Sequence, residues 1–156
     1  MDKPKFVYVI YIDTTPEKLW AALTGGDFTY QYWAGRRLES DWRAGSPVRL
    51  VREDGGVNLQ GEVLRAEPPR LLSYTFGVLN DEGKLRERPS RVTFELAQVM
   101  GKVKLTLIHD DFVPDSKMPD EISQGWPAIL SGLKSLLEGG RALFPGWRTA
   151  EEMHRA

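Results

Sequence analysis

Residues 125–140 read Gly-Trp-Pro-Ala-Ile-Leu-Ser-Gly-Leu-Lys-Ser-Leu-Leu-Glu-Gly-Gly, and this stretch decides the fold. Its apolar residues recur at helical spacing and form one broad apolar face, while polar side chains occupy the back. The apolar residues are Trp126, Ile129, Leu130, Leu133, Leu136 and Leu137. Because proline is tolerated only in the first turn of a helix, Pro127 predicts that the regular helix starts near Trp126. Gly139 or Gly140 can supply the left-handed residue that ends it.

Most of the chain before this helix is typical of β-strands. Residues 5–12 are rich in β-branched and aromatic residues, which predicts a first strand. From residue 37 onward apolar and polar residues alternate, and turn residues recur at short intervals. Six further strands are predicted at residues 37–40, 48–52, 57–66, 71–78, 90–96 and 103–109. Short connections favour an antiparallel meander, which the C-terminal helix would cover.

Two short helices are predicted between the first and second strands. The first begins either with Thr15 as N-cap and Pro16 at the first helical position, or with a capping box over Thr14–Glu17. The second is expected over residues 27–33, with Asp27 as its N-cap. The sequence thus predicts an α+β fold with one long helix packed across a seven-stranded sheet.

The length and composition restrict the function. A chain of 156 residues suits a single domain with one core. A formal charge of −1 with evenly mixed charges argues against nucleic-acid binding, and the absence of cysteine excludes disulfides and thiolate metal sites. No apolar run has the length of a signal peptide or a membrane span, so we expect a cytoplasmic protein.

Several short motifs occur in an order that resembles one known family. They are Ile12-x-x-x-Pro16-Glu17-x-x-Trp20-x-x-Leu23, Tyr32-Trp33-x-Gly35, Glu39-Ser40-Asp41-Trp42-x-x-Gly45-Ser46, Gly61-x-Val63 with Pro68-Pro69-x-Leu71, Leu105-Thr106-Leu107-x-His109, and Gly125-Trp126-x-x-Ile129-Leu130-x-x-Leu133-Lys134-x-x-Leu137-Glu138-x-Gly140. In these motifs the chain resembles the AHSA1-like family of the START/Bet v 1-like (SRPBCC) superfamily, which is named after a domain of activators of the Hsp90 ATPase. The resemblance spans nearly the whole of residues 1–156 and implies a single domain with a C-terminal tail from residue 141.

The resemblance implies a helix-grip fold, in which a curved antiparallel sheet holds the last helix and leaves an elongated apolar cavity between them. In that superfamily such cavities hold hydrophobic molecules or lipids, and some members are cyclases, aromatases or hydrolases. Fold and family do not determine the function of this chain. The chain lacks the separate N-terminal domain of the eukaryotic Hsp90 activators, so the resemblance does not directly extend chaperone stimulation to it.

Eight residues are candidates for contact with a ligand in such a cavity. They are Trp33, Trp42, Phe76, His109, Trp126, Ile129, Leu130 and Leu133. Each also has a plain structural interpretation: the apolar side chains can be core, and Trp33 and Trp42 can seal the end of the sheet. His109 lies on the same alternating face as Leu105 and Leu107, so it should point inward, where it can bind a ligand, act as acid or base, or be satisfied by neighbours.

Three functions are therefore weighed. The first is binding of a hydrophobic or aromatic small molecule in the cavity, with His109 or Trp33 as polar anchor. The second is a protein-interaction module, with an Hsp90-type chaperone as the partner, and the third is a cyclase or lyase that would depend on His109. No cofactor and no metal ion are expected, because no catalytic motif or ligand set recurs at suitable spacing. Residues 141–156 can dock through Phe144 and Trp147, which leaves monomer and homodimer open.

Overall fold

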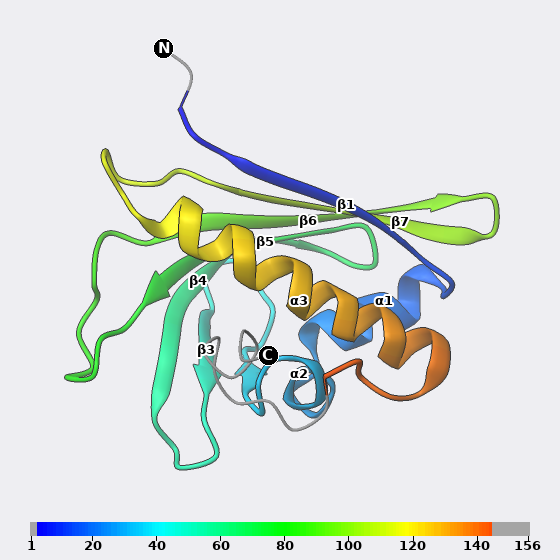
Figure 1. Cartoon of the computed structure of the whole chain (residues 1–156), viewed down its shortest axis with the longest axis horizontal. Coiled ribbons are helices and arrows are strands. Elements are labelled where there is room, and N and C mark those ends of the chain that lie inside the picture. The colour runs from blue at the N-terminus through cyan, green and yellow to red at the C-terminus, as the bar shows by residue number, and fades with distance from the viewer. Residues whose placement is uncertain (1–2, 145–156) are drawn as a thin grey trace.

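The predicted strands form one antiparallel sheet in a computed structural model that describes residues 3–144. The sheet follows the order β1-β7-β6-β5-β4-β3-β2, so the first strand lies at one edge and pairs with the last (Figure 1). The seven strands are β1 (Phe6–Ile12), β2 (Arg37–Glu39), β3 (Pro47–Val51), β4 (Val57–Glu67), β5 (Leu71–Val78), β6 (Ser90–Val99) and β7 (Lys102–Asp110). The sequence therefore predicted every strand to within a few residues.

The two short helices, α1 (Pro16–Thr24) and α2 (Gly26–Tyr32), follow β1 as predicted. Of the two possible starts for α1, the structure has Thr15 as N-cap, with its hydroxyl accepting from the Lys18 N–H at 3.2 Å. The predicted cap of α2 was wrong, because Gly25 is its N-cap and Asp27 lies inside the first turn. The Gly25 carbonyl accepts the first N–H groups of α2, so one residue ends α1 and starts α2.

The long helix α3 (Met118–Gly139) starts eight residues before the predicted position. Pro119 occupies the first turn, while Pro127 lies inside the helix. A proline inside a helix lacks the N–H that would donate to the carbonyl four residues earlier, and this usually ends the helix. Here Ile122 and Trp126 are four residues apart and both are buried, so packing of the extended apolar face outweighs the lost hydrogen bond. Gly140 ends the helix in the left-handed conformation, as predicted.

The helix α3 lies along one face of the bent sheet, which we call the inner face (Figure 1). Alternate residues of β5, β6 and β7 point toward it and are buried. They include Leu72, Tyr74, Phe76, Val92, Phe94, Leu96, Val103, Leu105, Leu107 and His109. Register shifts between Leu50 and Val51 and between Val63 and Arg65 interrupt the ladders on either side of β4. Such shifts bend a strand, and the sheet turns at β4.

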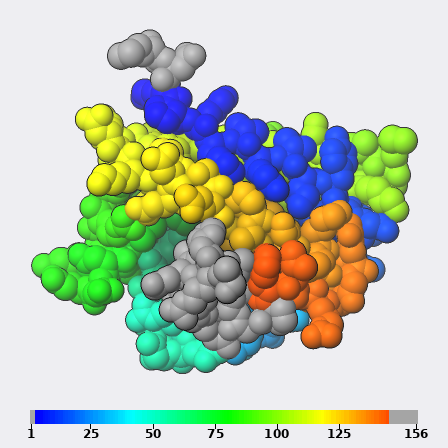
Figure 2. Space-filling model, in the orientation of Figure 1, coloured from blue at the N-terminus to red at the C-terminus, as the bar shows by residue number. Residues whose placement is uncertain are grey.

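The edge strand β1 lies beside α3 on the surface shown in the space-filling view (Figure 2). The ammonium group of Lys134 donates to the carbonyl of Tyr11 at 2.6 Å, and Glu138 accepts from the N–H of Asp13 at 2.8 Å. These contacts satisfy polar backbone groups at the free edge of β1.

Two further expectations from the sequence concern membrane spans and docking of the C-terminal segment. No helix among residues 3–144 is long and apolar enough to cross a membrane. Phe144 is 37% exposed, while Trp147, the other predicted docking residue of the C-terminal segment, lies outside the described residues. Docking of that segment stays a prediction.

Candidate functional site

Aromatic side chains from several elements surround Trp126 in the first half of α3. The ring centroid of Trp126 lies 5.3 Å from that of Trp33, which follows α2, and 5.9 Å from those of Phe76 in β5 and Phe94 in β6. His109 at the end of β7 is 6.2 Å away. These tilted arrangements are favourable for aromatic rings. The fold thus brings together four of the eight predicted residues, namely Trp33, Phe76, His109 and Trp126.

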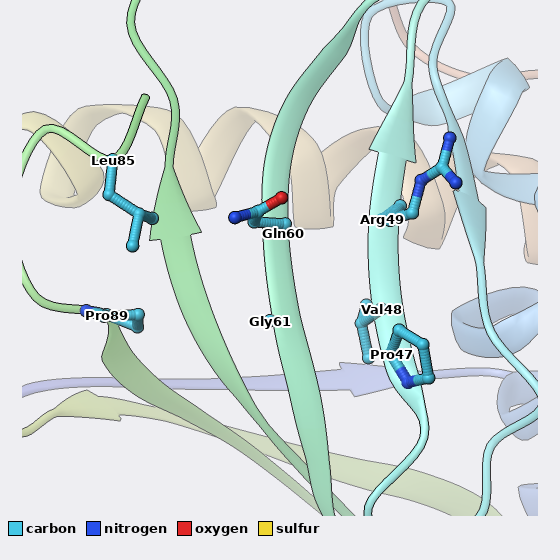
Figure 3. A pocket seen from close by; sticks show the side chains of 7 residues that line it. All are labelled: Pro47, Val48, Arg49, Gln60, Gly61, Leu85 and Pro89. Atoms are coloured by element: carbon cyan, nitrogen blue, oxygen red, sulfur yellow. The ribbon is translucent and has the colours of Figure 1, made fainter. Parts of the chain in front are cut away.

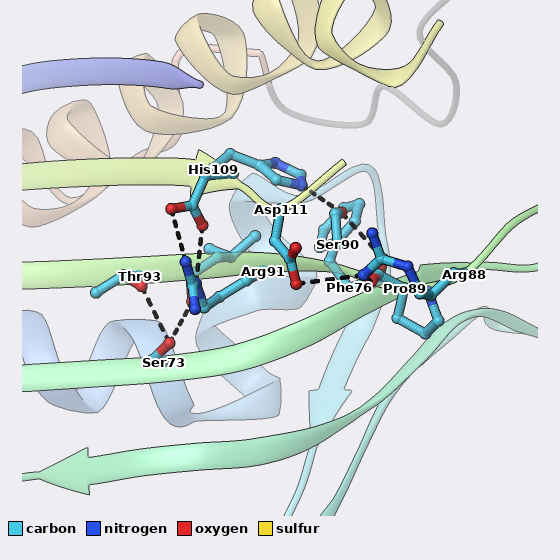
Figure 4. Close-up of polar contacts among 11 residues, drawn as sticks. Ser73, Phe76, Arg88, Pro89, Ser90, Arg91, Thr93, His109 and Asp111 are labelled. Carbon is cyan, nitrogen blue, oxygen red and sulfur yellow. Dashed lines mark hydrogen bonds and ion pairs between the residues drawn. The ribbon is translucent and has the colours of Figure 1, made fainter. Parts of the chain in front are cut away.

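His109 is fully buried and uses both ring nitrogens in hydrogen bonds, and Figure 4 shows the bond to Ser90. The indole N–H of Trp126 donates to its Nδ1 at 3.0 Å. Because an indole nitrogen is only a donor, Nδ1 must be the unprotonated nitrogen, and Nε2 carries the proton. Nε2 then donates to the Ser90 hydroxyl at 2.7 Å, and that hydroxyl donates to the Phe76 carbonyl at 3.3 Å. The result is a chain of hydrogen bonds that joins α3, β7, β6 and β5.

The electrostatic state of His109 follows from its surroundings. Burial lowers the pKa of His109 to about 4, and the neighbouring Asp110 carboxylate offsets this only in part. Phe76 and Phe112 pack on the imidazole with ring centroids 4.8 and 4.9 Å away. A charged imidazole would be poorly solvated among these rings, so His109 is neutral at physiological pH.

This arrangement restricts the chemistry of the Ser90 and His109 pair. A serine nucleophile needs a histidine nitrogen with a free lone pair facing its hydroxyl. In this site the nitrogen that faces Ser90 carries the proton, and the lone pair on the other nitrogen accepts from Trp126. The hydrogen bonds therefore hold the aromatic side chains in place and do not activate Ser90.

Trp42 is held in place by contacts within the protein, and its contact with a ligand stays a prediction. Its indole N–H donates to the carbonyl of Thr24 at 2.9 Å, and its ring packs on Tyr74 with centroids 6.0 Å apart. This bond ties the segment after β2 to the end of α1. Because its only polar atom is already used, Trp42 can offer a ligand nothing but apolar surface.

Two donors on largely buried residues have no protein partner among residues 3–144: the indole N–H of Trp33 and the hydroxyl of Tyr74. The described part of the chain leaves no sealed side-chain nitrogen or oxygen unpaired, so both atoms border space that water can reach. Burial raises the pKa of the Tyr74 phenol, so the hydroxyl stays protonated and able to donate. These are the two polar groups of the inner face that remain available.

The other predicted residues lie along α3 in a gradient of burial. Ile129 is 8% exposed, whereas Leu130 and Leu133 are 1% and 0% exposed. Ile122, Trp33 and Phe76 share the 8% exposure of Ile129. The more accessible of these buried residues therefore lie near the aromatic residues, while Leu136 and Leu137 near the end of α3 are only partly buried.

Sequence reasoning overlooked Tyr74 and Ser90 as site residues. Tyr74 lies on the inward face of β5, where the alternation of the strand could have indicated its hydroxyl as an interior donor. Ser90 opens β6 on the same face as Val92 and is directly opposite Phe76. His109 pairs with Val92, so Ser90 is its diagonal neighbour on the inner face, and this placement is the signal that could have indicated the hydrogen bond. Among residues 3–144 no group of acidic and histidine side chains is arranged to hold a metal ion.

The comparison with protein families agrees with the fold and the motifs. The family model "Activator of Hsp90 ATPase homolog 1-like protein" matches residues 13–138. The chain belongs to this family. No curated protein matches the sequence significantly.

Solved structures are similar over most of the chain. Protein MLL2253 from Mesorhizobium loti is 29% identical, with a TM-score of 0.74 over 86% of this chain and 97% of that one. The Aha1 dimer from Colwellia psychrerythraea is 21% identical, with a TM-score of 0.72 over 89% and 99%. CalU16 from Micromonospora echinospora is 20% identical, with a TM-score of 0.69 over 87% and 77%. The last two similarities concern the fold alone. The helix-grip fold is thus the expected one for an AHSA1 family member.

Proposed function

We propose that this AHSA1 family member binds an uncharged apolar or aromatic small molecule between α3 and the inner face of the sheet. The observation that supports this most is the pair of interior donors on Trp33 and Tyr74. Both groups border space that water reaches, and a ligand with acceptor oxygens can replace that water as their hydrogen-bond partner. The surrounding aromatic and aliphatic side chains favour an apolar ligand body.

The charge at the site favours a neutral ligand. His109 is neutral, and the rings of Phe76, Phe112 and Trp126 surround it. A charged ligand group would lose its hydration without gaining an opposite charge from these residues. An aromatic ketone, or a related molecule with one or two oxygen acceptors, fits these requirements.

Two measurements test this proposal. Native mass spectrometry of the freshly purified protein should detect a bound small molecule that is lost on denaturation. Titration with the fluorescent naphthyl ketone Prodan should show saturable binding with a blue-shifted emission. Replacing Trp33→Phe or Tyr74→Phe should each weaken Prodan binding about fivefold, because each removes a hydrogen bond to the carbonyl worth roughly 1 kcal/mol.

The matched control is Trp42→Phe. It makes the same change of side chain, but the lost N–H is the one bonded to Thr24, so Prodan affinity should stay unchanged. Equal affinities for the wild type and for all three variants would contradict the assignment of Trp33 and Tyr74. Absence of any saturable binding of Prodan, together with no co-purified molecule, would argue against ligand binding itself.

A further inference from the structure

A pocket of about 290 Å³ lies on the outer face of the sheet, and Figure 3 views this face with α3 behind the strands. Arg49 in β3 and Gln60 in β4 point away from α3, because their chain neighbours Leu50 and Leu59 are buried in the core. The pocket is lined by Pro47, Val48, Arg49, Gln60, Gly61, Leu85 and Pro89. The sheet therefore separates this pocket from the candidate site on the inner face.

The walls of the outer pocket are apolar and open to solvent. Pro47 stands on one side of β4, while Leu85 and Pro89 of the connection between β5 and β6 stand on the other (Figure 3). Leu85 is 42% exposed. Leu85 and Pro89 lie directly on the sheet because Gly77 has no side chain: a Cβ atom there would lie 2.7 Å from Leu85 Cδ2 and 3.2 Å from Pro89 Cγ. Exposed apolar walls around a hollow favour the apolar body of a ligand.

Two polar side chains with unused donors stand beside these walls. Arg49 and Gln60 are direct cross-strand partners, and both are exposed. Among residues 3–144 neither side chain makes a hydrogen bond or an ion pair, although Glu39 is opposite Arg49 on β2. The nearby Arg52, by contrast, is paired with Asp54. The outer pocket thus combines apolar walls with a guanidinium and a carboxamide that no described residue uses.

The charge of the outer pocket selects an anion. Arg49 is the only charged residue that lines it within the described chain. A guanidinium can donate two parallel N–H bonds to a carboxylate, and the Gln60 amide beside it can donate another. Glu62 lies opposite Pro47, so a carboxylate is favoured at the Arg49 end of the pocket. A volume of about 290 Å³ is at the lower end for small-molecule sites, which suits a ligand of one or two rings.

We propose that the outer pocket is a second ligand site, which binds a small aromatic carboxylate. Arg49 and Gln60 hold the carboxylate, and Pro47, Leu85 and Pro89 contact the ring. This inference goes beyond the proposed function and does not depend on it. The two sites lie on opposite faces of the sheet and differ in charge, so the inner site takes a neutral ligand and the outer site an anion.

The test titrates nitrogen-15-labelled protein with 2-naphthoate and follows the amide signals by NMR. We expect saturable shifts confined to residues 47–49, 60–61 and 77–89. Arg49→Gln should weaken 2-naphthoate binding about fivefold, because glutamine keeps a donor and loses the charge. The uncharged analogue 2-naphthamide should bind the wild type about fivefold more weakly than 2-naphthoate, and Arg49→Gln should not weaken it further.

The matched control is Arg43→Gln. Arg43 is also exposed and makes no ion pair among residues 3–144, but it lies outside the outer pocket, so 2-naphthoate affinity should equal that of the wild type. A second variant, Leu85→Ser, tests the apolar wall and should weaken 2-naphthoate binding about threefold. Equal affinities in Arg49→Gln and Arg43→Gln, or shifts confined to inner-face residues such as Phe76 and Trp126, would overturn the proposal.

Prodan separates failure of the outer site from failure of the inner one. Trp33→Phe and Tyr74→Phe should leave 2-naphthoate affinity unchanged, and Prodan should bind equally well when the outer pocket is saturated with 2-naphthoate. Loss of Prodan binding with 2-naphthoate binding retained at residues 47–49 would reject the inner site and support the outer one. Displacement of 2-naphthoate by Prodan would overturn the outer site, because the two ligands would then share one cavity.

Discussion

The two halves of α3 pack against the same sheet in different ways. In the second half, Leu130 and Leu133 are sealed from solvent, and Gly132 packs beside Tyr32. In the first half, Trp126 is hydrogen-bonded to His109 among aromatic rings, and Ile122 keeps some solvent access. The comparison teaches that one amphipathic helix can complete the core at one end and form the wall of a candidate binding site at the other.

The largest expected difference between the two halves is the loss of stability when one buried side chain is replaced by alanine. Replacing Leu133→Ala should destabilise the protein by about 4 kcal/mol, because the side chain is fully buried and would leave a cavity. Replacing Ile122→Ala in the first half should cost only about 2 kcal/mol, because solvent can enter the space it leaves. Urea denaturation followed by circular dichroism measures both values. Equal losses would show that the two halves are packed alike and would remove the contrast.

The next effect concerns the buried imidazole of the first half. The pKa of His109 is about 4 in the folded protein, against 6.5 for a free histidine. Between these pH values the unfolded chain binds more protons than the folded one, so stability should decrease as the pH falls from about 6.5 to 4. The full difference corresponds to about 3 kcal/mol of unfolding free energy.

The control for this pH dependence is His109→Asn, which removes the titrating group. Carboxylates such as Glu138, whose pKa is lowered by its bond with Lys134, titrate at the acid end of the same range in both proteins. When the urea midpoint is plotted against pH, the curves of the wild type and of His109→Asn should therefore differ in slope only by the contribution of His109. Parallel curves for the two proteins would mean that the imidazole is not held neutral by burial.

The smallest effect tests the close approach in the second half. A Cβ atom at Gly132 would lie 3.4 Å from Cβ of Tyr32, which is an ordinary contact distance. Replacing Gly132→Ala should therefore stabilise the protein by about 0.5 kcal/mol, because alanine favours the helix and fits without displacement. Thermal unfolding measures the change. A clear loss of stability would indicate that the packing there is tighter than the distance implies.

Local sequence patterns were sufficient to predict the helices and strands and to identify the family. Alternation of apolar residues located the strands, Thr15 with Pro16 marked the start of α1, and Gly140 marked the end of α3. They failed at Pro127 because the rule against proline inside a helix is local, whereas the burial of Ile122 and Trp126 depends on the sheet. They failed at Asp27 because Gly25 already capped α2.

The sequence alone determined the α+β architecture, the order of the elements and the inward direction of His109. These follow from the spacing of apolar residues, which recur every second residue in a strand and every 3.6 residues in a helix. Only the tertiary structure decided which polar atoms find partners. His109 bonds to Trp126 and Ser90, and Trp42 bonds to Thr24, whereas Trp33 and Tyr74 keep free donors within the described chain. These pairings join residues far apart in sequence, so they depend on how the sheet bends around the helix, which no local pattern records.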